Sequence, residues 1–210
     1  MTLSILAVDK EKEQLGIAVI TGSVAVGSRV PWAKAGIGVV ATQGFTNPSL
    51  GPIILQMLEK GFNVKYSLKI ALNRDPNPSL RQVAVLDAQG NFAVHTGKNT
   101  PDWKGHVIGE NCICVGNLIT GRDVLEELRS SFESTKGSLI NRLLVALREA
   151  VKKGGDKRGH RSAAILVVGN TIYGNVYDRI VDIRVDLSEN PINDLEKILY
   201  AIMGKSRIEL

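Results

Sequence analysis

One short polar segment, residues 154–162, carries the densest group of side chains that could do chemistry. It reads G-G-D-K-R-G-H-R-S and lies between the predicted end of a helix and a predicted buried strand. Asp156 and Arg158 can form a charge-assisted pair there, which would orient a substrate or position a terminal amine. A helix C-cap followed by a solvated loop explains the same residues equally well. His160 alone carries little weight, and Ser162 is a candidate substrate-binding residue at the start of the strand.

Further polar side chains stand at the ends of predicted apolar strands. Thr42 and Gln43 precede a predicted helix that Asn47 would cap, and such junctions offer free backbone N–H groups to an oxyanion or a carboxylate. Asn117 in G-N-L is placed similarly, whereas His95 in H-T-G is expected to make a structural hydrogen bond. Clefts open at strand ends in a sandwich, so all five are candidate site residues.

Apolar periodicity predicts the elements that must position these residues. Strands are predicted over residues 3–8, 15–20, 37–42, 82–86, 92–96, 111–118, 162–168 and 183–186. Helices are predicted to begin near residues 48, 63, 120, 138 and 191, the first four as two helical pairs. Two stacked sheets with a helix pair on each outer face would bury every apolar stripe. We therefore predict an α+β fold, a four-layer αββα sandwich, in one domain over residues 1–210. A doubly wound parallel sheet would instead require single crossover helices.

Composition restricts the class of protein further. With 44% hydrophobic residues, a net charge of +5 and only 5% aromatic residues, the chain fits a globular protein better than a nucleic-acid-binding one. It has no apolar stretch long enough for a membrane span and no basic leader, so a cytoplasmic location is expected. Cys112 and Cys114 would share one strand face and are predicted to be core residues. No cofactor and no metal site are expected.

Several sequence motifs, in order along nearly the whole chain, resemble those of one protein family. They are T-L-S-I-L-A-V-D, L-G-I-A-V-I-T-G-S-V-A-V-G, V-P-W-A-K-A-G-I-G-V-V-A-T-Q, N-P-S-L-G-P, H-T-G, G-N-L and G-G-D-K-R-G-H-R-S-A-A. The series resembles the prokaryotic domain-of-unknown-function family 1028, which is grouped with the N-terminal-nucleophile (Ntn) hydrolases and implies the αββα sandwich. Where that family usually reads V-Q-G-N, residues 114–117 read C-V-G-N here.

The resemblance implies a specific chemistry for the start of the chain. In Ntn hydrolases the first residue of the mature chain attacks an amide carbonyl, and its own α-amine, which titrates near about 7.7–8.0, acts as the base. Thr2 is the candidate nucleophile once Met1 is removed, because an acylated Thr2 has no free amine. Ser4 shares its strand face and is a candidate for substrate binding. Alternatively, Thr2 is a β-branched strand residue without a catalytic role.

Three functions are open on this basis. The first is an Ntn-type hydrolase of a small amide or peptide-like bond, in which Asp156 and Arg158 orient the site and Asn117 or backbone N–H groups hold the oxyanion. The second is a protein that binds a small anion through Lys157, Arg158 and Arg161. The third is a scaffold that forms a homodimer through the predicted last helix, since most soluble oligomers are C2 dimers.

Overall fold

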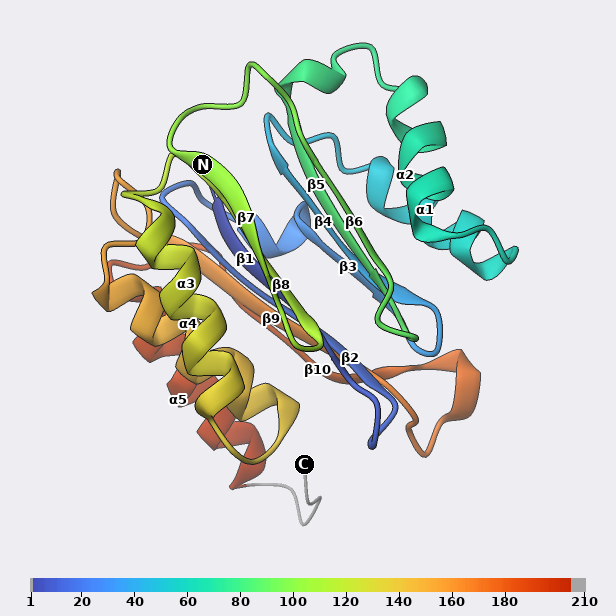
Figure 1. Ribbon diagram of the computed structural model, residues 1–210. Helices are drawn as coiled ribbons and strands as arrows, with labels where there is room; N and C mark the ends of the chain where they lie inside the picture. The colour runs from blue at the N-terminus through green and yellow to red at the C-terminus, as the bar shows by residue number, and fades with distance from the viewer. Residues whose placement is uncertain (1, 205–210) are drawn as a thin grey trace.

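Two stacked antiparallel sheets with helices on both outer faces make up residues 2–204, the part of the chain that the computed structural model describes (Figure 1). Within that part, one sheet has six strands in the order β10-β9-β2-β1-β8-β7, and the other has four in the order β3-β4-β5-β6. The strands of the first sheet are β1 (Thr2–Asp9), β2 (Gln14–Thr21), β7 (Lys104–Gly109), β8 (Cys112–Asn117), β9 (Ser162–Val168) and β10 (Arg179–Val185). Those of the second are β3 (Pro31–Lys34), β4 (Gly38–Gly44), β5 (Arg81–Asp87) and β6 (Phe92–Thr96).

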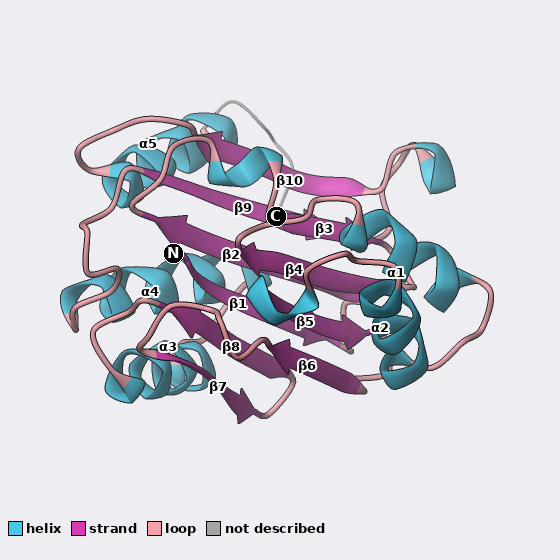
Figure 2. Ribbon diagram, turned by 90° about the horizontal axis from the view of Figure 1, so that it is seen from above, coloured by secondary structure: helices cyan, strands magenta, loops and turns pink. Residues whose placement is uncertain are grey.

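Helices cover the outer face of each sheet, and the strands of the two sheets lie over one another (Figure 2). The four-stranded sheet is covered by α1 (Leu50–Glu59) and α2 (Val64–Asn73), and the six-stranded sheet by α3 (Arg122–Ser134), α4 (Leu139–Lys152) and α5 (Pro191–Met203). The connections include the short 3₁₀ helices η1 (Val26–Ser28), η2 (Pro78–Leu80) and η3 (Gly174–Val176). The predicted four-layer αββα sandwich is confirmed. Across residues 2–204, no helix is both long and apolar enough to cross a membrane.

Side-chain alternation along the central strand β1 explains the layers. Leu3 and Ile5 pack with apolar side chains of α3 and α4, whereas Leu6 and Val8 pack between the two sheets. A third apolar cluster lies under α1 and α2. Burial of each such side chain contributes about 1.5–3 kcal/mol, and a one-residue slip would turn them all to the wrong face. The apolar pattern therefore sets the register of the sheet.

Two asparagines that were predicted to start helices behave differently. Asn63 caps α2 at the helix start predicted near residue 63, because its side chain accepts a hydrogen bond from the Tyr66 N–H at 2.9 Å. Asn47 instead accepts from the N–H of Ser49 at 3.2 Å, and α1 begins at Leu50. The predicted start of this helix was therefore two residues early, because Asn47 forms a turn in front of the helix.

The edges of the sheets differ most from the prediction. Strands β3 and β7 were not predicted, and β10 begins at Arg179 rather than near Ile183. All three lie at the edge of a sheet, where part of the strand faces water and the apolar pattern is broken.

The two cysteines are confirmed as core residues. Cys112 and Cys114 are both buried, unpaired and part of the cluster beneath α3 and α4. Burial raises the pKa of the Cys114 thiol well above its ordinary value, and contact with Cys112 raises it further. A thiol held neutral in this way is unreactive.

Candidate functional site

A row of polar side chains crosses one end of the six-stranded sheet, on the face that meets the other sheet. Thr2 on β1 pairs with Asn117 on β8, and Thr21 on β2 pairs with Ser162 on β9. Leu3 on β1 pairs with Ile20 on β2, so Thr2 and Thr21, the next residue on each strand, complete the row. All four residues are buried. The apolar strands therefore end in a band of hydroxyl and amide groups.

The four-stranded sheet presents a matching row. Gln43 on β4 pairs with Gln82 on β5, which pairs with Thr96 on β6. Gln82 Nε2 donates to Thr96 Oγ1 at 3.1 Å and, across the gap between the sheets, to the Gly116 carbonyl at 2.9 Å. Gln82 therefore joins the two sheets.

Hydrogen bonds between the two rows hold the Thr2 end of β1. Gln43 Nε2 donates to the Thr2 carbonyl at 3.2 Å and to Gln82 Oε1 at 2.8 Å. Ser4 Oγ donates to Gln43 Oε1 at 2.7 Å, and Asn117 Nδ2 donates to Gln82 Oε1 at 2.9 Å. A buried polar group that loses its partner costs about 1–3 kcal/mol, so this network fixes the backbone at Thr2. Within the described residues, Asn117 Oδ1 is buried and has no hydrogen-bond partner.

A cavity of about 330 Å³ opens at this end of β1, and Thr2 lines it although it is only 4% exposed. The polar side chains that line the cavity are those of Thr2, Thr21, Ser23, Arg29, Thr46 and Arg81. Gly44 also lines it with a φ of +85°, where an added Cβ would lie 2.7 Å from the Leu80 carbonyl oxygen. The cavity is at the low end of the range for small-molecule sites, about 300–1,000 Å³.

Asp156 and Arg158 form the predicted ion pair, with 3.5 Å between Arg158 Nη2 and Asp156 Oδ2. The Asp156 carboxylate accepts from the Gly22 N–H at 2.7 Å and from the Arg158 N–H at 2.8 Å. Arg158 also donates to Ser23 Oγ at 3.2 Å. The connection after β2 forms one wall of the cavity, and the Asp156–Arg158 pair holds this connection in place. The pair itself does not line the cavity. Its catalytic roles stay predictions.

Two other candidate residues hold the cavity walls from behind. Ser162 Oγ donates to the Ser23 carbonyl at 2.8 Å and accepts from the Val26 N–H at 3.1 Å. Thr42 Oγ1 donates to the Arg29 carbonyl at 3.0 Å. Both hydroxyls are engaged with backbone, and their roles in substrate binding stay predictions.

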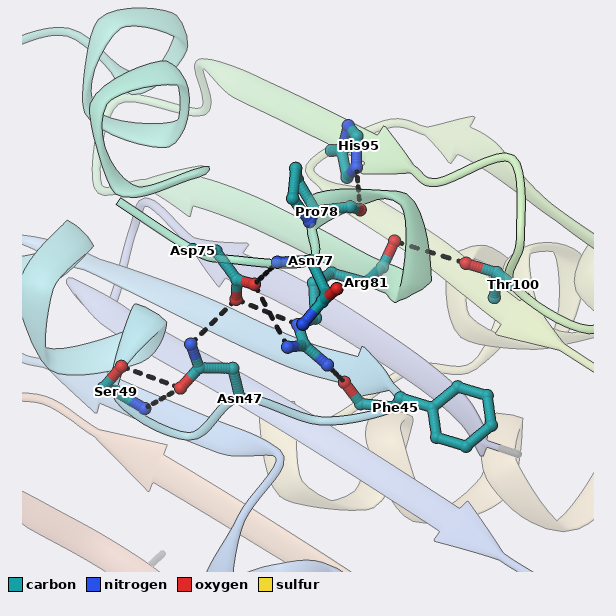
Figure 3. Close-up of polar contacts among 9 residues, drawn as sticks. All are labelled: Phe45, Asn47, Ser49, Asp75, Asn77, Pro78, Arg81, His95 and Thr100. Atoms are coloured by element: carbon teal, nitrogen blue, oxygen red, sulfur yellow. Dashed lines mark hydrogen bonds and ion pairs between the residues drawn. The ribbon is translucent and has the colours of Figure 1, made fainter. Parts of the chain in front are cut away.

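The buried Asp75 carboxylate anchors Arg81, which lines the cavity (Figure 3). Arg81 Nε and Nη2 donate to the two Asp75 oxygens at 2.9 and 3.1 Å, and Nη1 donates to the Phe45 carbonyl. Asn47 Nδ2 donates to Asp75 Oδ2 at 2.7 Å. Burial alone would raise the pKa of the Asp75 carboxyl, but the hydrogen bonds that it accepts, the largest from Arg81, lower it. Asp75 therefore stays ionised and holds Arg81 in place. Asn47 contacts Asp75 and does not line the cavity.

His95 lies outside the Thr2 cavity. Its Nε2 is 2.8 Å from the Pro78 carbonyl oxygen, the kind of structural hydrogen bond expected for it (Figure 3). His95 lines a separate cavity of about 650 Å³ between α2 and β6, together with His106. None of the described residues lining that cavity bears a hydroxyl or a thiol nucleophile. We therefore place the candidate active site at the smaller cavity.

The arginines predicted to bind an anion lie apart from Thr2. Arg158 and Arg161 line a third cavity of about 590 Å³, whose lining also includes Glu189. Lys157 is exposed. Among residues 2–204, no three His, Cys, Asp or Glu side chains are grouped to hold a metal ion.

His160 is expected to make the stability of the 154–162 segment depend on pH. Its Nε2 accepts the Asp156 N–H at 3.1 Å, which only the neutral ring can do. Burial lowers the pKa of His160 below its ordinary 6.5, and the nearby Asp156 carboxylate only partly opposes this. The unfolded chain therefore binds a proton first, and the free energy of unfolding should fall as the pH drops below about 6.5.

Urea unfolding between pH 5 and 8 measures this effect. His160→Gln, which keeps a hydrogen-bond acceptor but does not titrate, is the matched control. Parallel stability curves for the two proteins would show that His160 does not contribute.

The fold and the candidate site thus define an αββα-sandwich protein in which a threonine begins a central strand beside a cavity. The model of the Family of unknown function (DUF1028) matches residues 2–195. The chain therefore belongs to this family, as its motifs indicated. A crystal structure from the same family, protein SPO2555 from Silicibacter pomeroyi, is similar with a TM-score of 0.88 and 32% identity, over 98% of this chain and 87% of that one.

Structures of Anbu, the ancestral β-subunit, align with the chain at lower similarity. Anbu from Yersinia bercovieri aligns with a TM-score of 0.42 and 11% identity over 100% of both chains. A Gly-1 mutant of Anbu from Hyphomicrobium sp. strain MC1 gives 0.46 and 11%, over 100% of this chain and 99% of that one. Scores this low carry no conclusion about function. No curated protein matches the chain.

Six polar residues at or behind the cavity were not predicted from the sequence, namely Thr21, Ser23, Arg29, Thr46, Arg81 and Gln82. The alternation of inward- and outward-facing residues along a strand does indicate Thr21 and Gln82. Each continues a period-two series of inward-facing positions at the end of an apolar strand. Arg29 and Arg81 had no such signal. One lies in an irregular connection, and the other resembles any exposed arginine at the start of a strand.

Proposed function

We propose that this protein hydrolyses a small amide or peptide-like bond by the Ntn mechanism, with Thr2 as nucleophile and its α-amine as base. The observation that carries the proposal is the position of Thr2. It begins a central strand, lines a cavity of about 330 Å³ and has its carbonyl held by Gln43. The α-amine becomes free only after hydrolysis of the Met1–Thr2 bond, a step that a methionine aminopeptidase would supply.

In the proposed reaction the Thr2 α-amine carries the proton in every step. The neutral α-amine accepts the hydroxyl proton of Thr2 as Oγ1 bonds to the carbonyl carbon of the substrate. The C–N bond of the tetrahedral intermediate then breaks, and the protonated amine gives its proton to the leaving nitrogen. Water hydrolyses the resulting ester by the same proton route, so that one water is consumed and one acid and one amine are released.

Asn117 is well placed to orient the amine as a positioning residue. It pairs with Thr2 in the sheet, and its buried Oδ1 has no partner among the described residues. An N–H group of a free amine at Thr2 would supply the missing hydrogen bond. Asn117 Nδ2 already donates to Gln82. Of the two expected oxyanion donors, backbone N–H groups therefore suit the role better than this amide.

An electrophilic β-lactone probe is expected to acylate Thr2 in protein from which Met1 has been removed. The neighbouring amine should activate this hydroxyl alone, so the intact mass should rise by one probe. Peptide mass spectrometry should then locate the label on residue 2.

Protein that retains Met1 is the control, because its Thr2 nitrogen is an amide and cannot act as the base. Equal labelling of both forms, or a label on another residue, would contradict the proposed mechanism.

The homodimer and the cytoplasmic location stay predictions. Helix α5 packs on its sheet through Leu195 and Leu199 and leaves Tyr200 63% exposed, so its outer face is the surface that a second copy would cover. Light scattering of the full chain tests the dimer, which a monomeric mass would exclude.

A further inference from the structure

The described residues that line the Thr2 cavity include two arginines and no acidic side chain. Arg81 is only 12% exposed, and the Asp75 carboxylate behind it balances its charge. Arg29 is exposed, and within residues 2–204 its guanidinium makes no hydrogen bond or ion pair. The cavity therefore holds one positive charge that the protein leaves uncompensated.

We infer that the substrate carries a single carboxylate beside the scissile amide, as an N-acyl amino acid does, and that Arg29 binds this carboxylate. The inference rests on the proposed hydrolase function. A planar guanidinium matches a carboxylate through two parallel N–H···O bonds, and one uncompensated positive charge matches a monoanion.

The small volume of the cavity places Thr2 and Arg29 close together. A space of about 330 Å³ holds one small ligand, and both Thr2 and Arg29 line it. The backbone of Arg29 is also fixed, because its carbonyl accepts from Thr42 Oγ1 at 3.0 Å and from Trp32 Nε1 at 3.1 Å. In a ligand whose amide lies at Thr2, only a few bonds can therefore separate that amide from the group that binds the Arg29 guanidinium.

A phosphate group could use the same guanidinium, but it carries a charge nearer to −2. The Thr2 α-amine is neutral when it acts as the base, and Asp75 already offsets the charge of Arg81, so a dianion would keep one negative charge without a partner in the cavity. The charge balance favours the carboxylate.

The first test compares two amides with the same scissile bond, N-acetylalanine and the neutral N-acetylalaninamide, in protein that begins at Thr2. The wild type should release acetate from the carboxylate with a kcat/KM about 10- to 100-fold higher, the usual effect of a charge-assisted hydrogen bond. Arg29→Ala should abolish this preference, because kcat/KM for N-acetylalanine should fall about 10- to 100-fold relative to that for N-acetylalaninamide. Arg122→Ala, which removes an exposed positive charge on α3, should keep the preference.

Calorimetric binding of the same two compounds and of inorganic phosphate separates this inference from the proposed function. Tighter binding of N-acetylalanine that Arg29→Ala abolishes supports the carboxylate site, even if no acetate is released, in which case only the hydrolase proposal is rejected. Equal binding of the acid and its amide overturns the inference. So does tighter binding of phosphate than of N-acetylalanine.

Discussion

Protein that begins at residue 2 and carries Thr2→Val is expected to lose at least about 10⁴-fold in kcat/KM on the amide that the wild type hydrolyses fastest. Valine keeps the branched Cβ and the volume of threonine, so it satisfies a buried strand position. It has no hydroxyl, so no acyl bond can form. The substitution thus separates a nucleophile from a β-branched strand residue. The measurement is the initial rate of amine release.

Thr2→Ser is the matched control, because it keeps both the hydroxyl and the α-amine. It should retain activity within about 100-fold of the wild type, since only the placement of the hydroxyl changes. Thermal unfolding should show that both variants are folded. If the valine variant stays active, Thr2 is a structural residue and the Ntn mechanism does not operate here.

The layers of the fold were predictable because apolar alternation is a local property. Along β1, Ile5 and Ala7 face the helices while Leu6 and Val8 face the other sheet, and this pattern can be read without knowing any partner. Edge strands β3 and β7 carry no such pattern, because neighbours on one side only do not require a continuous apolar face.

The site was predictable only in part. Alternation shows that Thr2, Ser4 and Gln43 are polar at inward-facing positions, which marks the end of the sandwich where the core becomes polar. It cannot show that Gln43 meets Ser4 and Gln82, each 39 positions away, because those contacts depend on how the two sheets stack. The pairing of side chains is a long-range property, and the local sequence does not contain it.

The polar 154–162 segment shows the same limit. Asp156 and Arg158 are near neighbours, so their ion pair could be expected. The strongest contact of Asp156 is with the Gly22 N–H, 134 positions away, and it converts the pair into a support for the cavity wall. The density of polar residues therefore indicated the right end of the sandwich, while the cavity lining came from other segments.

Replacement of the buried carboxylate in Asp75→Ala is expected to destabilise the protein by about 3–5 kcal/mol, the cost of leaving a partly buried charge without its partner. Arg81 would keep only the Phe45 carbonyl and lose its bidentate ion pair (Figure 3). Urea unfolding at neutral pH measures the loss.

The free energy of unfolding at acid pH gives an independent measurement of the Asp75 contribution. Folding lowers the pKa of Asp75, so its contribution is present above the ordinary value of 3.8 and is lost as the pH falls through the lower pKa of the folded state. The wild type should therefore lose its advantage over Asp75→Ala only below about pH 3.8.

Two further variants decide whether burial is the cause. Glu126→Ala breaks an ion pair of 3.0 Å with Arg122, but that pair is exposed and its loss should cost less than about 1 kcal/mol. The double variant Asp75→Ala, Arg81→Met removes both charges, so it should be less destabilised than the sum of the single changes. An equal cost for Asp75→Ala and Glu126→Ala would mean that Arg81 does not depend on the buried carboxylate. The charge balance in the Thr2 cavity, with Arg29 as its one uncompensated cation, would then have to be assigned differently.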